Sequence, residues 1–319
     1  MRFAVSAEQR QFAESLHELL ARADTPAAGR AWARGEHEPG LKVWRELADL
    51  GVPALLVPER RGGLGASATD LVVVFEVLGH HAVPGPLAES VAVAPSLLAP
   101  ELLPALASGE LIASVALPPL VPFALDADVA GVVLRVRDGR TERVEIAEGP
   151  VRSVDAARRL FRVEPEGTPL GAAPAEAFEL GVLAVSAQLL GAGQWLLERA
   201  SAYAKQREQY GRPIGSYQAV KHLLADVATR LELARPLVHG AAVAVTGGEA
   251  VARDVSAAKV AAGEAAYLAA RTALQVHGAI GYTAEHDLGL WLTKVRALTG
   301  AWGGAGHHRA RVLAALEDM

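Results

Sequence analysis

The sequence predicts a mostly α-helical protein with a small β domain in the middle of the chain. The 319 residues are 51% hydrophobic, and alanine and leucine are so frequent that helices around a large core are favoured. Apolar residues recur at helical spacing toward both ends, whereas the middle alternates with a period of two. We therefore expect three domains, over residues 1–110, 111–168 and 169–319.

The first domain is expected to contain only helices and loops. Helices are predicted over residues 6–20, 44–52 and 71–78. Ser6 can cap the first of them, and Thr69 and Asp70 can cap the third. The proline- and glycine-rich segment 57–65 favours a loop between the second and third helices.

The middle domain is expected to be a compact β unit of about 55 residues. Strands are predicted over residues 111–117, 129–137, 143–146 and 161–163. Asp138-Gly139 directly follows the second strand, and this dipeptide is typical of a two-residue hairpin turn.

The helical period returns after Pro174 and continues through the third domain. Long helices are predicted over residues 177–205, 216–246, 249–277 and 288–299. Because the connections between them are short, an antiparallel bundle is expected. Gly247-Gly248 and the segment 278–281 mark two of its turns.

Composition excludes several classes of function. A net charge of -5 gives no broad electrostatic reason to bind nucleic acid or an anionic membrane. The absence of cysteine excludes disulfides, thiolate nucleophiles and cysteine metal sites. Without an apolar leader or an uninterrupted apolar run long enough to span a bilayer, the chain is expected to be soluble and cytoplasmic.

The connection between the first two long bundle helices holds the most specific motif. Arg207 offers a rigid fork of donors that suits a pyrophosphate, and Gly211 and Pro213 favour a sharp turn that lets the backbone approach a ligand. An ordinary helix–helix turn with a surface arginine explains the same residues, and spacing alone favours that interpretation.

The full segment Arg207-Glu-Gln-Tyr-Gly-Arg-Pro-Ile214, continued by Gln218 and Asp226, resembles the R-x-Q-[FY]-G-x-P-I-x-x-x-Q signature of acyl-CoA dehydrogenases. The resemblance implies FAD as the cofactor. It also implies that Arg207 and Gln209 contact the pyrophosphate of a FAD in a neighbouring subunit, with Gln218 close to the same cofactor.

A second segment, which begins at Gln275, resembles the Q-x-x-G-G-x-G-[FY] turn of the same family. Gln275 can hydrogen-bond a ribose or phosphate oxygen, and Gly278 allows close backbone approach. Ala279 stands where the family has its second glycine. The resemblance places this turn on the adenosine side of the flavin. Segments 44–52, 57–65 and 75–79 also resemble the family's first helical domain, so the likeness covers essentially the whole chain.

The chain departs from the family at the catalytic base. Dehydrogenation of an acyl-CoA requires a carboxylate that removes the α-proton of the thioester. The two positions at which family members carry this glutamate fall on Gly181 and Trp302 here. Glu179 is a displaced candidate, although residues two apart on a helix do not share a face.

Other polar residues near these motifs are interpreted as structural. Glu264, Glu285 and His286 are expected to be solvated or paired. His307-His308 is expected to be a solvated tail, because adjacent histidines lack the spacing of a helical zinc pair. No metal site is predicted.

The middle domain departs from the family as well, since segment 116–119 replaces the family's T-E-P-x-A-G-S stretch and the strand that carries a tryptophan over the flavin is missing.

The resemblance therefore implies the base-lacking subunit of a heterotetrameric acyl-CoA dehydrogenase, with a homologous catalytic chain as partner. Short subunits of this kind occur in actinobacterial steroid side-chain degradation. This suggests a steroid acyl-CoA substrate, and an electron-transferring flavoprotein is the family's acceptor. A homomeric dehydrogenase that uses Glu179 and a noncatalytic scaffold that has lost FAD remain alternatives.

Overall fold

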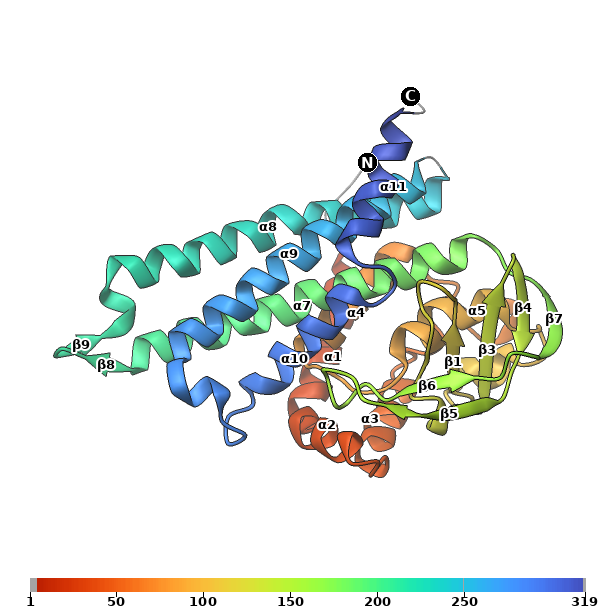
Figure 1. The fold of residues 1–319 in the computed structure, drawn as a ribbon, viewed down its shortest axis with the longest axis horizontal. Helices are drawn as coiled ribbons and strands as arrows, with labels where there is room; N and C mark the ends of the chain where they lie inside the picture. Colours follow the sequence, from red (N-terminus) through yellow and green to blue (C-terminus); the bar gives the residue numbers. More distant parts are fainter. Residues whose placement is uncertain (1–4, 249, 318–319) are drawn as a thin grey trace.

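The computed structural model describes residues 5–248 and 250–317. The N-terminal part is helical, as predicted. Its elements are α1 (Ala7–Arg22), α2 (Thr25–Ala33), α3 (Glu38–Asp49), η1 (Glu59–Arg61), α4 (Ala68–His80), η2 (Ala88–Val93), α5 (Ala94–Leu97) and α6 (Leu103–Ala107). Helix α4 passes through the centre of the molecule and packs along the bundle, whereas α2 and α3 lie at the outside (Figure 1).

Helix caps in this part follow the rules used for prediction, with one correction. Ser6 caps α1, because its Oγ accepts from Gln9 N at 3.1 Å and its own N donates to Gln9 Oε1 at 2.9 Å. Helix α4 begins after Ser67 rather than at Thr69 or Asp70. Ser67 is the N-cap, and the Asp70 carboxylate completes a capping box by accepting from Ser67 N at 2.8 Å.

The middle part is a β unit at one end of the molecule (Figure 1). Its strands are β1 (Ala113–Ala116), β2 (Ala124–Leu125), β3 (Val132–Arg137), β4 (Arg140–Arg143), β5 (Ile146–Val151), β6 (Leu160–Val163) and β7 (Thr168–Ala172). They form one sheet of order β1-β3-β4-β7 and a second of order β2-β6-β5, and every pair except β1–β3 is antiparallel.

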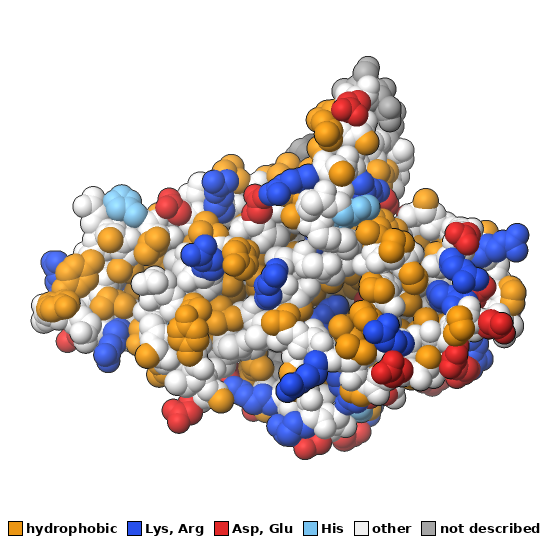
Figure 2. Space-filling model, viewed as in Figure 1, with side chains coloured by type: hydrophobic (Ala, Val, Ile, Leu, Met, Phe, Trp, Pro, Cys, Tyr) orange, Lys and Arg blue, Asp and Glu red, His pale blue; other side chains and the backbone are white. Residues whose placement is uncertain are grey.

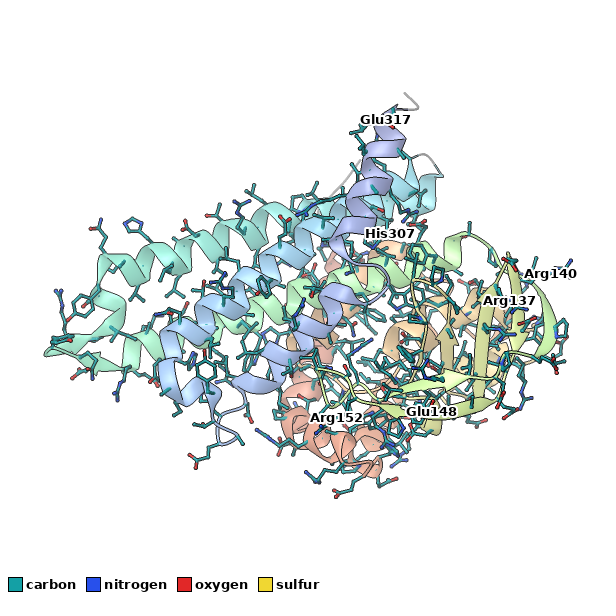
Figure 3. The ribbon with its side chains drawn as sticks, viewed as in Figure 1. Arg137, Arg140, Glu148, Arg152, His307 and Glu317 are labelled. Atoms are coloured by element: carbon teal, nitrogen blue, oxygen red, sulfur yellow. The ribbon has the colours of Figure 1, made fainter. Side chains whose placement is uncertain are left out.

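The hairpin predicted at Asp138-Gly139 is confirmed. Arg137 pairs with Arg140 across it, and Asp138 and Gly139 have φ angles of 52° and 71°, as a two-residue turn of this type requires. Both arginines lie at the outer edge of the unit (Figure 3). The strand predicted over 143–146 is wrong, because β4 ends at Arg143 and β5 starts at Ile146. Strand β7 continues beyond the limit predicted for this domain at residue 168.

The C-terminal part is a bundle of long helices, as expected from the extended helical period. Its helices are α7 (Glu176–Gln206), α8 (Gln218–Gly247), α9 (Val251–His277), α10 (Leu288–Gly300) and α11 (Ala305–Glu317). Helix α7 is long and apolar enough to cross a membrane, but 89% of its most apolar window is buried inside the protein. Its composition is thus explained by its place in the core.

The prediction of a solvated tail at His307-His308 is wrong. Both residues belong to α11, whose start is marked by His307 in Figure 3. His308 is completely buried, where its Nδ1 lies 3.1 Å from Ser256 Oγ and its Nε2 lies 2.9 Å from the carbonyl oxygen of Trp302. The helix is therefore fastened to α9 and to the turn that precedes it.

Candidate functional site

The predicted sharp turn after Arg207 is a projecting arm at the end of the bundle opposite the β unit (Figure 1). Strands β8 (Glu208–Gln209) and β9 (Arg212–Pro213) pair there, and η4 (Ile214–Ser216) leads into α8. Tyr210 and Gly211 close the hairpin with φ angles of 52° and 76°. At its base, Arg207 N donates to Tyr203 O and Ile214 N donates to Arg207 O, both at 2.8 Å.

The side chains of the arm suit an anionic ligand that approaches from outside the chain. Arg207, Gln209 and Gln218 are all exposed. Among residues 5–248 and 250–317, no hydrogen bond or ion pair engages the Arg207 guanidinium. The Gln209 side-chain amide makes only a local bond, from Nε2 to Glu208 O at 2.9 Å. A planar cation with free donors is the chemistry that binds pyrophosphate oxygens, so these residues fit the diphosphate of FAD.

The second motif lies at the same end of the bundle. Tyr203, on the last turn of α7, stacks on His277, the last residue of α9, with ring centroids 4.4 Å apart. Gln275, Gly278 and Ala279 are exposed beside this contact, where α9 gives way to η5 (Gly278–Tyr282).

Gly278 is needed for its backbone conformation. Its φ of 62° lies in the left-handed region, and a Cβ there would meet no atom within 4 Å. The space beside Gly278 is therefore open, which leaves room for a ligand against the backbone.

The Trp302 side chain packs directly on Gly181, so it occupies the space at both positions to which the resemblance assigns the family's base. Trp302 lies in the turn between α10 and α11 with a φ of 56° and is 1% exposed. A Cβ on Gly181 would lie 2.5 Å from its ring. The indole thus occupies the space above α7, and it fits there only because position 181 has no side chain.

Buried polar groups that the sequence analysis missed hold the Trp302 turn. Lys259 Nζ donates to Leu298 O at 3.0 Å, to Thr299 O at 3.2 Å and to Gly303 O at 3.5 Å. Burial, and to a lesser extent the nearby Arg158, lowers the pKa of Lys259 to about 7. Together with the contact from His308 to the Trp302 carbonyl, these bonds fix the turn from two helices.

A buried carboxyl group faces the same place. Glu89 lies on η2, a π-helical segment of a kind often found at functional sites. Its Oε1 accepts from Trp302 Nε1 at 3.3 Å, whereas its Oε2 has no partner within the part of the chain that the structure describes. Burial raises the pKa of Glu89, and Arg158 opposes this shift. The one charged residue in the apolar run 87–98 was the signal that could have identified it.

Glu89 lines a small pocket between η2, the β unit and the α10–α11 turn. The pocket has a volume of about 200 Å³, and its lining also includes Phe123, Arg158, Ala297 and Trp302. Its walls are mostly apolar. This pocket lies next to position 302, one of the two positions to which the resemblance assigns the family's base. It is narrow, and the Trp302 indole closes it on one side.

Glu179 does not line this pocket. It forms an ion pair with Arg311, in which Oε1 contacts Nη2 and Oε2 lies 3.3 Å from Nη1. Glu264 is likewise paired, with Arg309, and Glu285 is exposed. His286 packs against His277 and accepts from Leu288 N at 3.1 Å. Glu179, Glu264 and His286 therefore each have a structural partner, whereas among the described residues Glu285 has none of these contacts.

We predict that Glu89→Gln raises stability at neutral pH. Since folding raises the pKa of Glu89, the stability that this group contributes is fully present below its ordinary value of 4.5 and is lost as pH rises toward the folded pKa. Glutamine keeps an oxygen that accepts from Trp302 and does not ionise. In urea denaturation, the variant should exceed the wild type at pH 8 and match it at pH 4, whereas Glu264→Gln, which removes a surface ion pair with Arg309, should not exceed the wild type at pH 8. A constant difference across pH would contradict the assignment.

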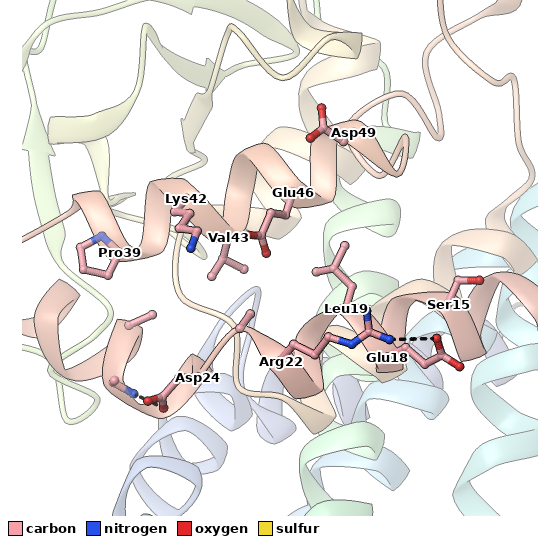
Figure 4. A pocket seen from close by; sticks show the side chains of 13 residues that line it. Ser15, Glu18, Leu19, Arg22, Asp24, Pro39, Lys42, Val43, Glu46 and Asp49 are labelled. Carbon is pink, nitrogen blue, oxygen red and sulfur yellow. Dashed lines mark hydrogen bonds and ion pairs between the residues drawn. The ribbon is translucent and has the colours of Figure 1, made fainter.

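A larger hollow between α1, α2 and α3 has a different character (Figure 4). Its volume is about 700 Å³, and its lining mixes acidic and basic side chains, with Glu18 and Arg22 paired at 3.5 Å. None of the residues of the arm or of the Glu89 pocket lines it. We therefore place the candidate site at the arm and the Trp302 turn.

The bundle, the arm and the β unit together define an acyl-CoA dehydrogenase fold. Residues 6–111 match the model of the N-terminal domain of acyl-CoA dehydrogenases, and residues 172–316 match the model of their C-terminal domain. The chain is 34% identical over 295 residues to acyl-CoA dehydrogenase IpdE2 of Mycobacterium tuberculosis, covering 90% of each. The chain belongs to the acyl-CoA dehydrogenase family, which confirms the resemblance seen in the sequence.

Solved structures agree on the fold. The ChsE4-ChsE5 complex from Mycobacterium tuberculosis contains a chain that superposes with a TM-score of 0.86 at 23% identity, with all of both chains covered. A chain of the Tcur3481-Tcur3483 steroid ACAD superposes with a TM-score of 0.84 at 22% identity, with 99% of both covered. At this level of identity the likeness concerns the fold.

Proposed function

We propose that this chain is the non-base-bearing subunit of a heteromeric, FAD-dependent acyl-CoA dehydrogenase. The reaction class is that of the family, α,β-dehydrogenation of an acyl-CoA thioester, in which bound FAD accepts the β-hydrogen as hydride. In this proposal, the chain's own residues bind and orient the cofactor. The α-proton is removed by a carboxylate of the partner.

The Trp302 indole above Gly181 is the observation that carries this proposal. It fills the space next to both family positions for the base, and the displaced candidate Glu179 is held by Arg311. The arm, in contrast, exposes Arg207, and no residue in 5–248 or 250–317 engages its guanidinium. A chain that lacks a base yet presents flavin-binding donors outward is best explained as serving a FAD in another subunit.

Exposed apolar side chains on the bundle support a homologous partner. Leu223, Leu233 and Leu237 on α8 and Tyr267 on α9 are between 41% and 62% exposed. Figure 2 shows hydrophobic side chains spread among charged ones over the bundle. Such side chains suit burial against another helical bundle. A heterotetramer with a homologous catalytic chain is the assembly we propose.

The acyl group that we propose is a steroid side-chain thioester. Its support is the resemblance to short subunits of such enzymes, together with a fold shared with a chain described as part of a steroid ACAD. We also propose an electron-transferring flavoprotein as acceptor and a cytoplasmic location, as expected from the sequence.

Co-expression with a homologous dehydrogenase of the same genome tests the proposed function. We expect a complex with bound flavin that oxidises acyl-CoA, and an inactive chain when it is purified alone. Native mass and flavin absorbance give the stoichiometry. An active, fully flavin-loaded homo-oligomer of this chain would refute the proposal, and a flavin-free complex would favour a scaffold.

Arg207→Ala should weaken FAD binding in that complex by about 10–100-fold, because a charge-assisted hydrogen bond contributes roughly 1.5–3 kcal/mol. FAD titration of the deflavinated complex measures the change. Arg140→Ala, which removes an exposed arginine from the tip of the β unit, is the matched control and should bind FAD like the wild type. Equal affinity of both variants would show that the arm does not hold the cofactor.

Glu179→Gln should leave the activity of the complex within about twofold of the wild type, because its carboxylate is committed to Arg311. Steady-state oxidation of acyl-CoA is the measurement. Loss of activity with an unchanged melting temperature would instead support the alternative in which Glu179 is the base.

A further inference from the structure

Three histidines from α1 and α4 lie close together, away from the flavin arm and the Glu89 pocket. His17 lies on α1, His80 is the last residue of α4, and His81 is its C-cap. One ring nitrogen of each lies within 4.8 Å of one from each of the others. His17 Nδ1 and His81 Nε2 are 3.0 Å apart. Because His17 is 64 residues from His81 in the sequence, its contact with this adjacent pair is visible only in the fold.

One nitrogen of this cluster has no hydrogen-bond partner among the residues that the structure describes. His80 Nε2 lies 3.0 Å from Glu198 Oε2 on α7, and Gln194 Nε2 donates to Glu198 Oε1 at 2.8 Å. In the neutral tautomer that donates Nε2–H to this carboxylate, His80 Nδ1 carries a lone pair. This atom is buried, and the described residues offer it no hydrogen bond. A buried imidazole lone pair without a donor is an unusual feature that a cation would satisfy.

The surroundings hold these rings in place. Trp291 Nε1 donates to His80 O at 3.0 Å, and Thr25 Oγ1 donates to His81 O at 2.6 Å. The carboxylate on the far nitrogen of His80 reproduces the carboxylate–histidine–metal arrangement that orients ligands in metal sites. Burial lowers the pKa of His17, and it lowers that of His81 to about 4. The neutral imidazole is the form that binds metals.

We propose that His17, His80 and His81 form a binding site for Zn²⁺ or a similar divalent cation that prefers imidazole ligands. Tetrahedral zinc with bonds of 2.0–2.1 Å places its ligand atoms roughly 3.3–3.4 Å apart. The nitrogens of His17 and His81, 3.0 Å apart, would separate slightly, and the nitrogen of His80, which lies within 4.8 Å of them, would move closer. Water fills the fourth position, and Glu198 stays in the outer shell. The site joins α1 to α4 and, through Glu198, to α7. It is independent of the flavin function.

Zinc titration of untagged, EDTA-treated protein tests this site. We expect one equivalent of Zn²⁺ to bind by calorimetry and to raise the melting temperature, and Co²⁺ to give the intense visible bands of a tetrahedral complex. His17→Ala and His81→Ala should each weaken binding by more than about 100-fold, and Glu198→Gln by about 10–100-fold. His222→Ala removes an exposed histidine of α8 and is the matched control.

The melting temperature separates metal binding from a structural role of the histidines. We expect Zn²⁺ to raise the melting temperature of the wild type and of His222→Ala but not that of metal-free His17→Ala, whatever the melting temperature from which this variant starts. The proposal fails if the wild type binds no stoichiometric Zn²⁺, or if His17→Ala and His81→Ala bind it as tightly as His222→Ala does.

Discussion

Trp302→Ala should destabilise the protein by about 3–5 kcal/mol, the range for removing a large aromatic side chain from a core. The indole is 1% exposed, packs against α7 at Gly181, and donates to the buried Glu89. The truncation therefore leaves a cavity and also removes the one described side-chain donor of that carboxyl. Urea denaturation measures the loss. Tyr210→Ala, which truncates a side chain that is 93% exposed on the arm, should change stability by less than about 0.5 kcal/mol.

A double-mutant cycle shows whether the indole and the missing side chain at position 181 are matched. Gly181→Ala alone should be destabilising, because its Cβ would lie 2.5 Å from the Trp302 ring. In the Trp302→Ala background the same change should be neutral or stabilising, since the clash is gone and alanine is the better helix former. An interaction energy near zero would mean that the two positions do not determine each other.

This pair shows how the family fold accommodates an indole where the proposed function has no base. A glutamate at either position would need the space that the indole occupies, and the Trp302 turn is fixed by Lys259 and His308. A glutamate at position 181 therefore also requires a change at Trp302, whereas a glutamate at position 302 would replace the indole itself. The same packing makes the pocket beside Glu89 small, at about 200 Å³, which leaves little room for an acyl chain in this subunit.

The long helices were predictable because their apolar period extends over many turns. Helices α7 to α10 follow that period closely. The nine-residue helix α2 was missed because it is short and contains Pro26 and Gly29. Helix α11 was missed for a different reason. Its start follows glycines and carries two histidines, which favour a loop locally, and only the burial of His308 against Ser256 and Trp302 fixes it. Tertiary contacts overrode local propensity there.

The residues of the candidate site also fall into those that the local sequence reveals and those that only the fold brings together. Arg207, Gln209 and Gln218 stand in one continuous motif, so the sequence alone identified the arm. The Glu89 pocket draws on residues 89, 158 and 302, Trp302 also packs on Gly181, and the histidine cluster draws on residues 17, 80 and 81. The sequence could indicate a gap at positions 181 and 302. It could not show that the Trp302 indole occupies the space at both positions, because this depends on how η2, α7 and the α10–α11 turn pack together.

Gly191→Ala should destabilise the protein by at least about 3 kcal/mol, beyond the usual range for one added methyl group. Gly191 lies where α7 crosses α4, and its Cβ would be 1.8 Å from Glu76 O and 2.7 Å from His80 N. These two atoms belong to the backbone of α4 and cannot rotate away as a side chain could. The two helices would have to separate, and the measurement is the free energy of unfolding in urea.

Gly263→Ala is the matched control, because it also adds one methyl group inside a long bundle helix. Its Cβ would meet only Thr299 Cγ2, at 3.9 Å. We expect this variant to be more stable than the wild type by roughly 0.5–1 kcal/mol, the usual gain from replacing glycine in a helix. If both variants behaved alike, close approach of α4 and α7 would not be the cause. Because His80 lies at this crossing, a separated α4 should also disturb the histidine cluster, so Gly191→Ala should reduce Zn²⁺ binding while Gly263→Ala leaves it unchanged.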